Sequence, residues 1–214
     1  MVARTLARTL AHVGNSLRVF FCPFNNMSSK LVRAGDAAFQ KSEKCNAELF
    51  TLTYGVLVTQ LLKDYENVDK VNGLLDKMGF NIGTRLVDEL LAKAELPNAC
   101  ATFKDAADVV AKVGFKMFLG INADATDWNK EYTSTTIVIY NNPLTDFVEL
   151  PDGYEKLKYC NIFCGVIRGA LEQVRMMVSA EIIKDTLCGS EQDHIRVTLV
   201  EMSGAAAGDD YKED

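Results

Sequence analysis

Two amphipathic helices separated by a short break dominate the hydrophobic pattern of this chain. The second helix is predicted from Thr102 to Gly120, because Thr102–Asp105 matches a capping box and a glycine commonly ends a helix. Pro97 predicts the end of the first helix. Apolar residues recur at helical spacing on both: Val71, Leu74, Leu75, Met78, Ile82, Leu86 and Leu90 on the first, and Phe103, Ala106, Ala107, Val110, Val113, Gly114 and Met117 on the second.

The remaining pattern predicts two further helices and a set of strands. One helix is expected at Glu48–Asp64 and a longer one at about Leu157–Ser179. Strands are expected at residues 125–129, 133–140, 180–187 and 194–202, with a short extended piece at 147–150. Helices first, then strands with one helix inserted, indicate an α+β domain whose helices pack on one face of a small antiparallel sheet.

Glycines at helical spacing indicate where helices approach one another closely. Gly79 and Gly83 are four residues apart in one predicted helix, and Gly165 and Gly169 repeat that spacing in another. Gly114 lies in the middle of a helix on its apolar face, where glycine costs about 1 kcal/mol relative to alanine. Such a glycine leaves room for a neighbouring helix or for a ligand or attached chain, and the pattern leaves both alternatives open.

The two ends of the chain differ from its middle. Residues 1–35 hold five basic and no acidic residues, although the net charge is −6. Residues 1–26 fit a mitochondrial transit peptide, a membrane-surface helix, or an upstream reading of the gene before Met27. Residues 27–45 are polar and mixed and are expected to be disordered or loosely attached. We therefore expect a domain at residues 46–202, after an extension (1–45) that the mature protein need not contain and before an acidic mobile tail (203–214).

The composition favours few kinds of chemistry. Six cysteines occur without any C-x-x-C spacing, which is typical of free thiols in a reducing compartment. With two histidines, His12 and His194, a metal site is not expected. No phosphate-binding loop, dinucleotide fingerprint or nucleophile elbow is present, so we expect no catalytic residues and no diffusible cofactor. The acidic balance argues against nucleic acid, and no run is long enough to span a membrane.

Cys100 is the candidate for chemistry that remains. It lies two residues before the predicted N-cap of the second helix, where the positive end of the helix dipole favours a thiolate. The alternative is an ordinary loop thiol without a role.

Five motifs, in order along the chain, resemble a known family. They are Glu48–Leu61 (ELFTLTYGVLVTQL), Lys63–Asn67 (KDYEN), Leu75–Leu86 (LDKMGFNIGTRL), Asn141–Pro151 (NNPLTDFVELP) and Cys164–Glu172 (CGVIRGALE). Over about residues 48–200 the chain resembles the Bet-three subunits of the transport protein particle, TRAPP.

This resemblance implies a core subunit of a vesicle-tethering complex in endoplasmic reticulum to Golgi transport. The subunit would form homodimers and heterodimers with other TRAPP subunits. It would contribute to a surface that acts on a Rab-type GTPase, with nucleotide exchange only in the assembled complex, so the chain by itself is not expected to be an enzyme. The implied location is cytoplasmic, peripheral to cis-Golgi and endoplasmic reticulum membranes.

The resemblance also implies a lipid. In this family a cysteine between the same two helices carries a palmitate-like chain as a thioester, inside a hydrophobic channel, and the matching residue is Cys100. The expected channel-lining residues are Ile82, Leu86, Val110, Gly114 and Met117. Asn98–Ala99 stand where the family has a basic residue before the cysteine, which leaves the rate of acylation open. Two other functions remain: a small-ligand or haem-sensor-like α+β domain, and an acyltransferase with Cys100 as nucleophile.

Overall fold

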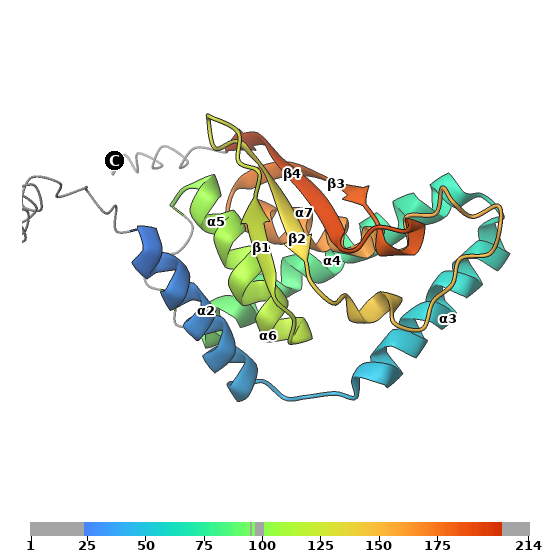
Figure 1. Ribbon diagram of the computed structural model, residues 1–214, viewed down its shortest axis with the longest axis horizontal. Coiled ribbons are helices and arrows are strands. Elements are labelled where there is room, and N and C mark those ends of the chain that lie inside the picture. The colour runs from blue at the N-terminus through green and yellow to red at the C-terminus, as the bar shows by residue number, and fades with distance from the viewer. Residues whose placement is uncertain (1–23, 95, 97–100, 203–214) are drawn as a thin grey trace, which may run out of the picture. The chain divides into compact units, whose positions relative to one another are not determined.

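The computed structural model describes residues 24–94, 96 and 101–202 (Figure 1). By internal contacts the chain divides into residues 1–30 and residues 31–214, and all contacts described below lie within the second unit. Helix α2 covers Phe24–Lys41, and its residues from Leu31 onward belong to the second unit. The other helices of this unit are α3 (Ala47–Tyr65), α4 (Val68–Lys93), α5 (Phe103–Val109), the π-helical turn η1 (Val110–Gly114), α6 (Phe115–Leu119) and α7 (Asn161–Gln173). Its strands are β1 (Ala123–Thr126), β2 (Ser134–Ile139), β3 (Met176–Lys184) and β4 (Asp193–Met202), and the 3-10 turns are η2 (Pro143–Thr145) and η3 (Thr186–Cys188).

The four strands form one antiparallel sheet in the order β1-β2-β4-β3. On β4, Ile195 and Val197 are buried while Arg196 between them is exposed, as the alternating pattern predicts. Helix α7 packs on β3, and the turn η1 packs on β1. Figure 1 shows α4 and α7 passing behind the sheet. The predicted α+β class, with helices on one face of a small antiparallel sheet, is confirmed.

Helices α4 and α7 cross in direct backbone contact. At each of four glycines a Cβ atom would overlap a backbone carbonyl group of the other helix: Gly79 that of Ile162, Gly83 that of Val166, Gly165 that of Asp76 and Gly169 that of Phe80. An ion pair between Arg168 Nη2 and Asp76 Oδ2, 2.7 Å apart, joins the same two helices. The close approach predicted from the glycine spacing is therefore correct, and the two glycine pairs pack against each other.

The predicted helix at Leu157–Ser179 is wrong at both ends, since α7 covers only Asn161–Gln173. Arg175 adopts a φ of +64°, a left-handed conformation that a helix cannot continue through. Met176 then pairs with Met202 and begins β3, which the sequence analysis placed four residues later. Pairing with a strand that is distant in sequence thus makes this segment extended, although its local pattern favours a helix.

Two other extended segments also differ from the prediction. The first strand covers Ala123–Thr126 and not residues 125–129, because Asp127 turns the chain with a φ of +51°. The piece expected at residues 147–150 pairs with no strand in the described part of the chain, and Phe147 is 63% exposed.

The expectation that residues 27–45 are disordered or loosely attached is wrong for much of that segment. Helix α2 continues to Lys41, and its Ala38 side chain is fully buried. The helical stripe consists of Leu31, Gly35 and Ala38, two of which are too small to give a strong hydrophobic pattern. The apolar cluster that this stripe joins contains residues of α4, α5, η1 and α6, so the burial of α2 depends on tertiary packing.

Candidate functional site

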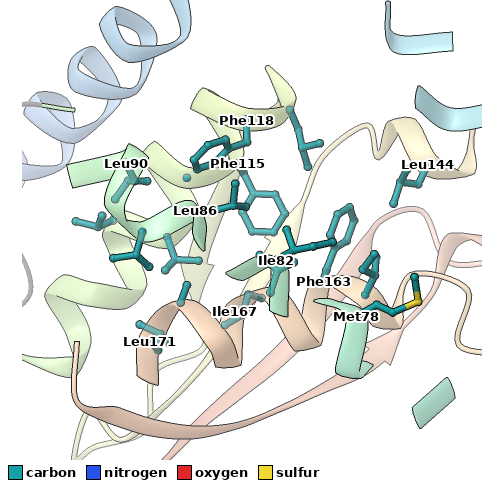
Figure 2. A pocket seen from close by; sticks show the side chains of 18 of the residues that line it. Met78, Ile82, Leu86, Leu90, Phe115, Phe118, Leu144, Phe163, Ile167 and Leu171 are labelled. Carbon is teal, nitrogen blue, oxygen red and sulfur yellow. The ribbon is translucent and has the colours of Figure 1, made fainter. Parts of the chain in front are cut away.

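An apolar cavity of about 520 Å³ lies between α3, α4, the α5–η1–α6 segment and α7. Figure 2 shows side chains from α4, α6 and α7 converging on the space, with Leu144 of η2 at one end. The labelled residues that line it are Met78, Ile82, Leu86, Leu90, Phe115, Phe118, Leu144, Phe163, Ile167 and Leu171. Among all the described residues on its wall, only Thr53 and Tyr54 carry a polar side-chain atom other than sulfur. Such a lining suits a hydrocarbon ligand.

Tyr54 lines the cavity, but its hydroxyl group is hydrogen-bonded within the protein and does not interact with the cavity. Its hydroxyl donates a hydrogen bond to the backbone carbonyl of Tyr159, and the two rings meet edge to face with centroids 5.1 Å apart. Burial raises the pKa of the Tyr54 phenol above its ordinary value, so the group stays neutral. The wall at this point is therefore uncharged and its hydrogen-bonding capacity is used internally.

The π-helical turn η1 determines which residues of the α5–α6 segment face the cavity. The Phe115 N–H donates to the carbonyl of Val110, five residues back, so the turn contains one residue more than an α-helical turn. One extra residue rotates the following positions by about 100° relative to a continuous α-helix. Phe118 therefore takes the place on the cavity wall that an uninterrupted helix would give to Met117.

The structure places four of the five predicted lining residues on the cavity wall and the fifth elsewhere. Ile82 and Leu86 reach the cavity from α4, and Val110 and Gly114 reach it from η1. Met117 does not line the cavity. It is buried in a second cluster with Ala38, Ala94, Val109 and Val113, which the register shift at η1 explains.

Gly114 borders open space. A Cβ atom built there would lie 3.8 Å from Leu90 Cδ1 and 4.0 Å from the Val109 carbonyl oxygen, both ordinary contact distances. The neighbouring helix α4 meets this point through the Leu90 side chain and not through its backbone, in contrast to the overlaps at the α4–α7 crossing. Gly114 therefore has room for a side chain, and the passage of a ligand or attached chain beside it stays a prediction.

The cavity reaches the surface along an apolar rim. Three residues of its wall are large, apolar and well exposed: Phe50 (43%), Ile82 (41%) and Leu91 (49%). They come from α3 and α4, so the opening lies on the side of the molecule that these two helices form.

Cys100 lies outside the described residues, as do Pro97 and the Asn98–Ala99 pair. The helices on either side of it both contribute to the cavity wall, through Leu90 and Leu91 before it and Ala106 after it. Thr102 caps α5 as predicted, because its hydroxyl oxygen accepts a hydrogen bond from the Asp105 N–H, 3.2 Å away.

Sequence analysis missed the contribution of α3 and α7 to this wall. Helix α7 faces both the sheet and the cavity, and it reaches the cavity through Phe163 and Ile167 among others. The α3 residues on the wall, Phe50, Thr53, Tyr54 and Leu57, have an i, i+3, i+4, i+7 spacing that could have been found. The neighbouring threonines obscured this pattern.

Cys160 and Asp193 belong to a buried hydrogen-bond network that Asn142 joins. The Cys160 thiol is buried and accepts a hydrogen bond from Asn142 Nδ2 at 3.2 Å, and the same nitrogen donates to Asp193 Oδ2 at 2.7 Å. Burial raises the pKa of Cys160, and it raises the pKa of Cys164 to about 12. Both thiols thus remain protonated at neutral pH and pack as small buried residues.

No group of three or more potential metal ligands occurs in the described ranges. His194 lies on β4, where it pairs with Val138, and does not contribute to the cavity wall.

The outer face of α3 carries a second notable feature. Leu49, Leu52 and Val56 lie on one side of the helix and are 57–70% exposed. Leu52 and Val56 also line a groove of about 480 Å³, to which Tyr159 contributes. The Tyr159 hydroxyl is buried, and no hydrogen-bond partner for it is found among the described residues. We call these three α3 residues and the groove the outer α3 face.

Comparison with known proteins gives a consistent result. The family model described as "Transport protein particle (TRAPP) component" matches residues 50–198. The trafficking protein particle complex subunit 3 of Dictyostelium discoideum is 52% identical over 177 residues, which cover 82% of this chain and 95% of that protein. The transport protein particle subunit bet3 of Schizosaccharomyces pombe is 49% identical over 168 residues, covering 78% and 91%.

One solved structure is similar in both sequence and fold. It is a crystal structure of a trafficking protein particle complex subunit 3 from Naegleria fowleri, described as covalently bound to palmitic acid. The similarity has a TM-score of 0.73 at 54% identity and covers 76% of this chain and 100% of that chain.

Proposed function

This chain belongs to the transport protein particle (TRAPP) component family, and from that premise we propose that its cavity holds a long acyl chain in thioester linkage to Cys100. The observation that carries the proposal is the apolar cavity of about 520 Å³ formed by the helices on both sides of Cys100. The palmitic acid bound covalently to the Naegleria fowleri relative supports it. Within the family the chain is a core subunit of a TRAPP complex.

The size of the cavity fits the energetics of such a chain. An empty cavity of about 520 Å³ costs up to ~12 kcal/mol at ~24 cal/mol per Å³. A palmitate-like chain with about fourteen methylenes offsets up to ~11 kcal/mol at ~0.8 kcal/mol per methylene. An acyl chain held in the cavity would thus offset much of the cost of the empty space and would act as a part of the hydrophobic core.

Intact-mass measurement of the native full-length chain tests the attachment. Neutral hydroxylamine cleaves thioesters, so it should remove a mass close to that of a fatty acyl group. The Cys100→Ser variant should lack that mass, whereas Cys45→Ser, which replaces an exposed free thiol, should keep it. An unmodified Cys100 in protein taken from its own cell type would refute the proposal.

We further propose that the outer α3 face pairs this subunit with another TRAPP subunit or with a second copy. Leu49, Leu52 and Val56 form a seam with i, i+3, i+7 spacing, which suits a helix–helix interface. Sedimentation of the purified chain is expected to show a dimer or larger species at micromolar concentration.

The role in the assembled complex follows from the family. We propose that the complex, and not this chain alone, promotes nucleotide exchange on a Rab-type GTPase in endoplasmic reticulum to Golgi transport. In the part of the chain that the structure describes, no helix is long and apolar enough to cross a membrane. From the family's role we also propose peripheral contact with those membranes. The comparisons do not support a mitochondrial-targeting interpretation of residues 1–26.

Family membership does not favour the two other functions considered. A cysteine acyltransferase would pass the acyl group from Cys100 to a second protein, whereas the proposed role retains it. A haem sensor would show a Soret band, which we do not expect from this chain.

A further inference from the structure

The turn η1 is covered from outside by the second half of helix α2. A Cβ atom at Gly35 would lie 2.6 Å from the Lys112 carbonyl oxygen, 3.2 Å from Lys116 Cβ and 3.3 Å from Val113 Cα. These atoms belong to η1 and to the first turn of α6. The α2 backbone therefore lies directly on the π-helical turn, and only glycine permits this approach.

Other contacts hold α2 in the same place. Lys116 Nζ lies 3.4 Å from Asp36 Oδ1. The Phe39 ring packs on the Cα of Gly120, where a Cβ atom would lie 3.1 Å from the ring. The Lys116 ammonium group also lies over the Phe39 ring, 6.0 Å from its centroid. Helix α2 therefore contacts the α5–η1–α6 segment from η1 to the glycine that ends it.

The cluster under α2 and the cavity share a wall. Val113 and Met117 point toward α2 and are buried there with Ala38. Val109, Leu90 and Phe118 belong both to this cluster and to the cavity wall. The α5–η1–α6 segment thus has two apolar faces, one toward α2 and one toward the cavity, and the register of η1 decides which residue lies on which face.

We propose that residues Leu31–Lys41 of α2 act as a clamp that holds η1 in its π-helical register and thereby keeps the cavity open to an acyl chain. With α2 docked, Val113 and Met117 are buried outside the cavity, so the extra residue in the turn is favoured. Without α2 these two side chains would lose the cover that Leu31 and Ala38 provide. Relaxation of η1 to an α-helical turn would rotate the following positions by about 100° and bring Met117 to the cavity wall.

The clamp acts on the acyl-binding cavity of the proposed function, so this inference rests on that proposal. Its consequence is that release of α2 weakens retention of the acyl chain, although α2 itself does not line the cavity in the described part of the chain. Residues Leu31–Lys41 are thus positioning residues that act through η1.

A matched pair of variants of the full-length chain tests the clamp. Gly35→Leu places bulk against the Lys112 carbonyl oxygen and should displace α2. Ala37→Leu adds a similar bulk two residues away, at an exposed position of the same helix, and should leave α2 docked. Hydrogen exchange is measured at the amides of residues 110–118, and acyl occupancy is measured by intact mass.

We expect at least tenfold faster exchange at residues 110–118 in Gly35→Leu, with unchanged protection of β2 and β4, and a lower acyl occupancy. Ala37→Leu should match the wild type in both measurements. If Gly35→Leu loses protection throughout the sheet, the variant is too unstable for the test, and a chain that lacks residues 1–41 is measured in its place. That chain should also show faster exchange at residues 110–118 and a lower acyl occupancy.

Exchange and acyl occupancy equal to the wild type in Gly35→Leu, or in the shortened chain, would overturn the clamp. A wild type without any acyl group would instead refute the proposed function, and the exchange measurement would still decide whether α2 holds η1.

Discussion

Replacement of Gly114 by leucine separates a lipid-filled cavity from an ordinary packed core. Gly114 has helical φ and ψ of −61° and −57°, so leucine fits its backbone. Its Cβ atom would meet Leu90 Cδ1 at 3.8 Å and would enter the cavity without overlap. Removal of a helical glycine favours folding by up to ~1 kcal/mol. We therefore expect the melting temperature of acyl-free protein to stay within roughly 2–4 °C of the wild type or to rise by that amount.

The same substitution should weaken acyl binding strongly. Four added carbons fill space that the acyl chain would otherwise occupy, and each displaced methylene forfeits about 0.8 kcal/mol of burial. The loss of up to ~3 kcal/mol corresponds to roughly a hundredfold weaker retention of the chain within the cavity. Intact mass should show little or no acyl group on Gly114→Leu purified beside the wild type.

Two glycines on α4 provide the controls. A Cβ atom at Gly79 would overlap the Ile162 carbonyl group, so Gly79→Leu should lose roughly 1–3 kcal/mol or more through overpacking. Around Gly73 nothing lies within 4 Å of a Cβ atom, so Gly73→Leu should be stable and normally acylated. A Gly114→Leu protein that melts like Gly79→Leu and still carries its acyl group would show that the space beside Gly114 is not the acyl site.

Three further outcomes are expected. Iodoacetamide at pH 8 should label the exposed Cys45 well before Cys164, because burial raises the pKa of the latter thiol to about 12. For the same reason the free energy of unfolding should fall between about pH 9 and pH 12, since the unfolded thiol ionises near pH 8.5 while the folded one stays protonated, and Cys164→Ala should flatten that fall in urea titrations. Val56→Glu should shift sedimentation from dimer to monomer at micromolar concentration by placing a charge on the outer α3 face, whereas a dimer of unchanged strength would place the interface elsewhere. The isolated chain should release nucleotide from a Rab-type GTPase no faster than the spontaneous rate, and strong release by this chain alone would contradict the role assigned to the complex.

Local sequence signals were sufficient for much of the framework. The capping residue Thr102 and the terminating Gly120 bound the α5–α6 segment as predicted, because caps depend on residues within one turn. The glycine pairs of α4 and α7 were also recognised, since a position without a side chain is visible in the sequence itself. Four of the five predicted lining residues, Ile82, Leu86, Val110 and Gly114, lie on the cavity wall.

The sequence could also assign the family, because long motifs in fixed order do not depend on the exact boundaries of helices and strands. That assignment supplied the hypothesis of an acyl chain on Cys100. Composition and periodicity alone gave only a thiol beside a helix N-terminus.

Tertiary structure decided the remaining features, in which the conformation of a residue depends on contacts with residues far away in the sequence. Met176 joins a strand because it pairs with Met202. Helix α2 forms an ordered contact because Gly35 and Ala38 fit against η1, although neither residue is strongly hydrophobic. The extra residue in η1 turns Phe118 and not Met117 toward the cavity. A helical period read from sequence assumes one constant rotation per residue, so it cannot reveal a local change of register that packing on two opposite faces stabilises.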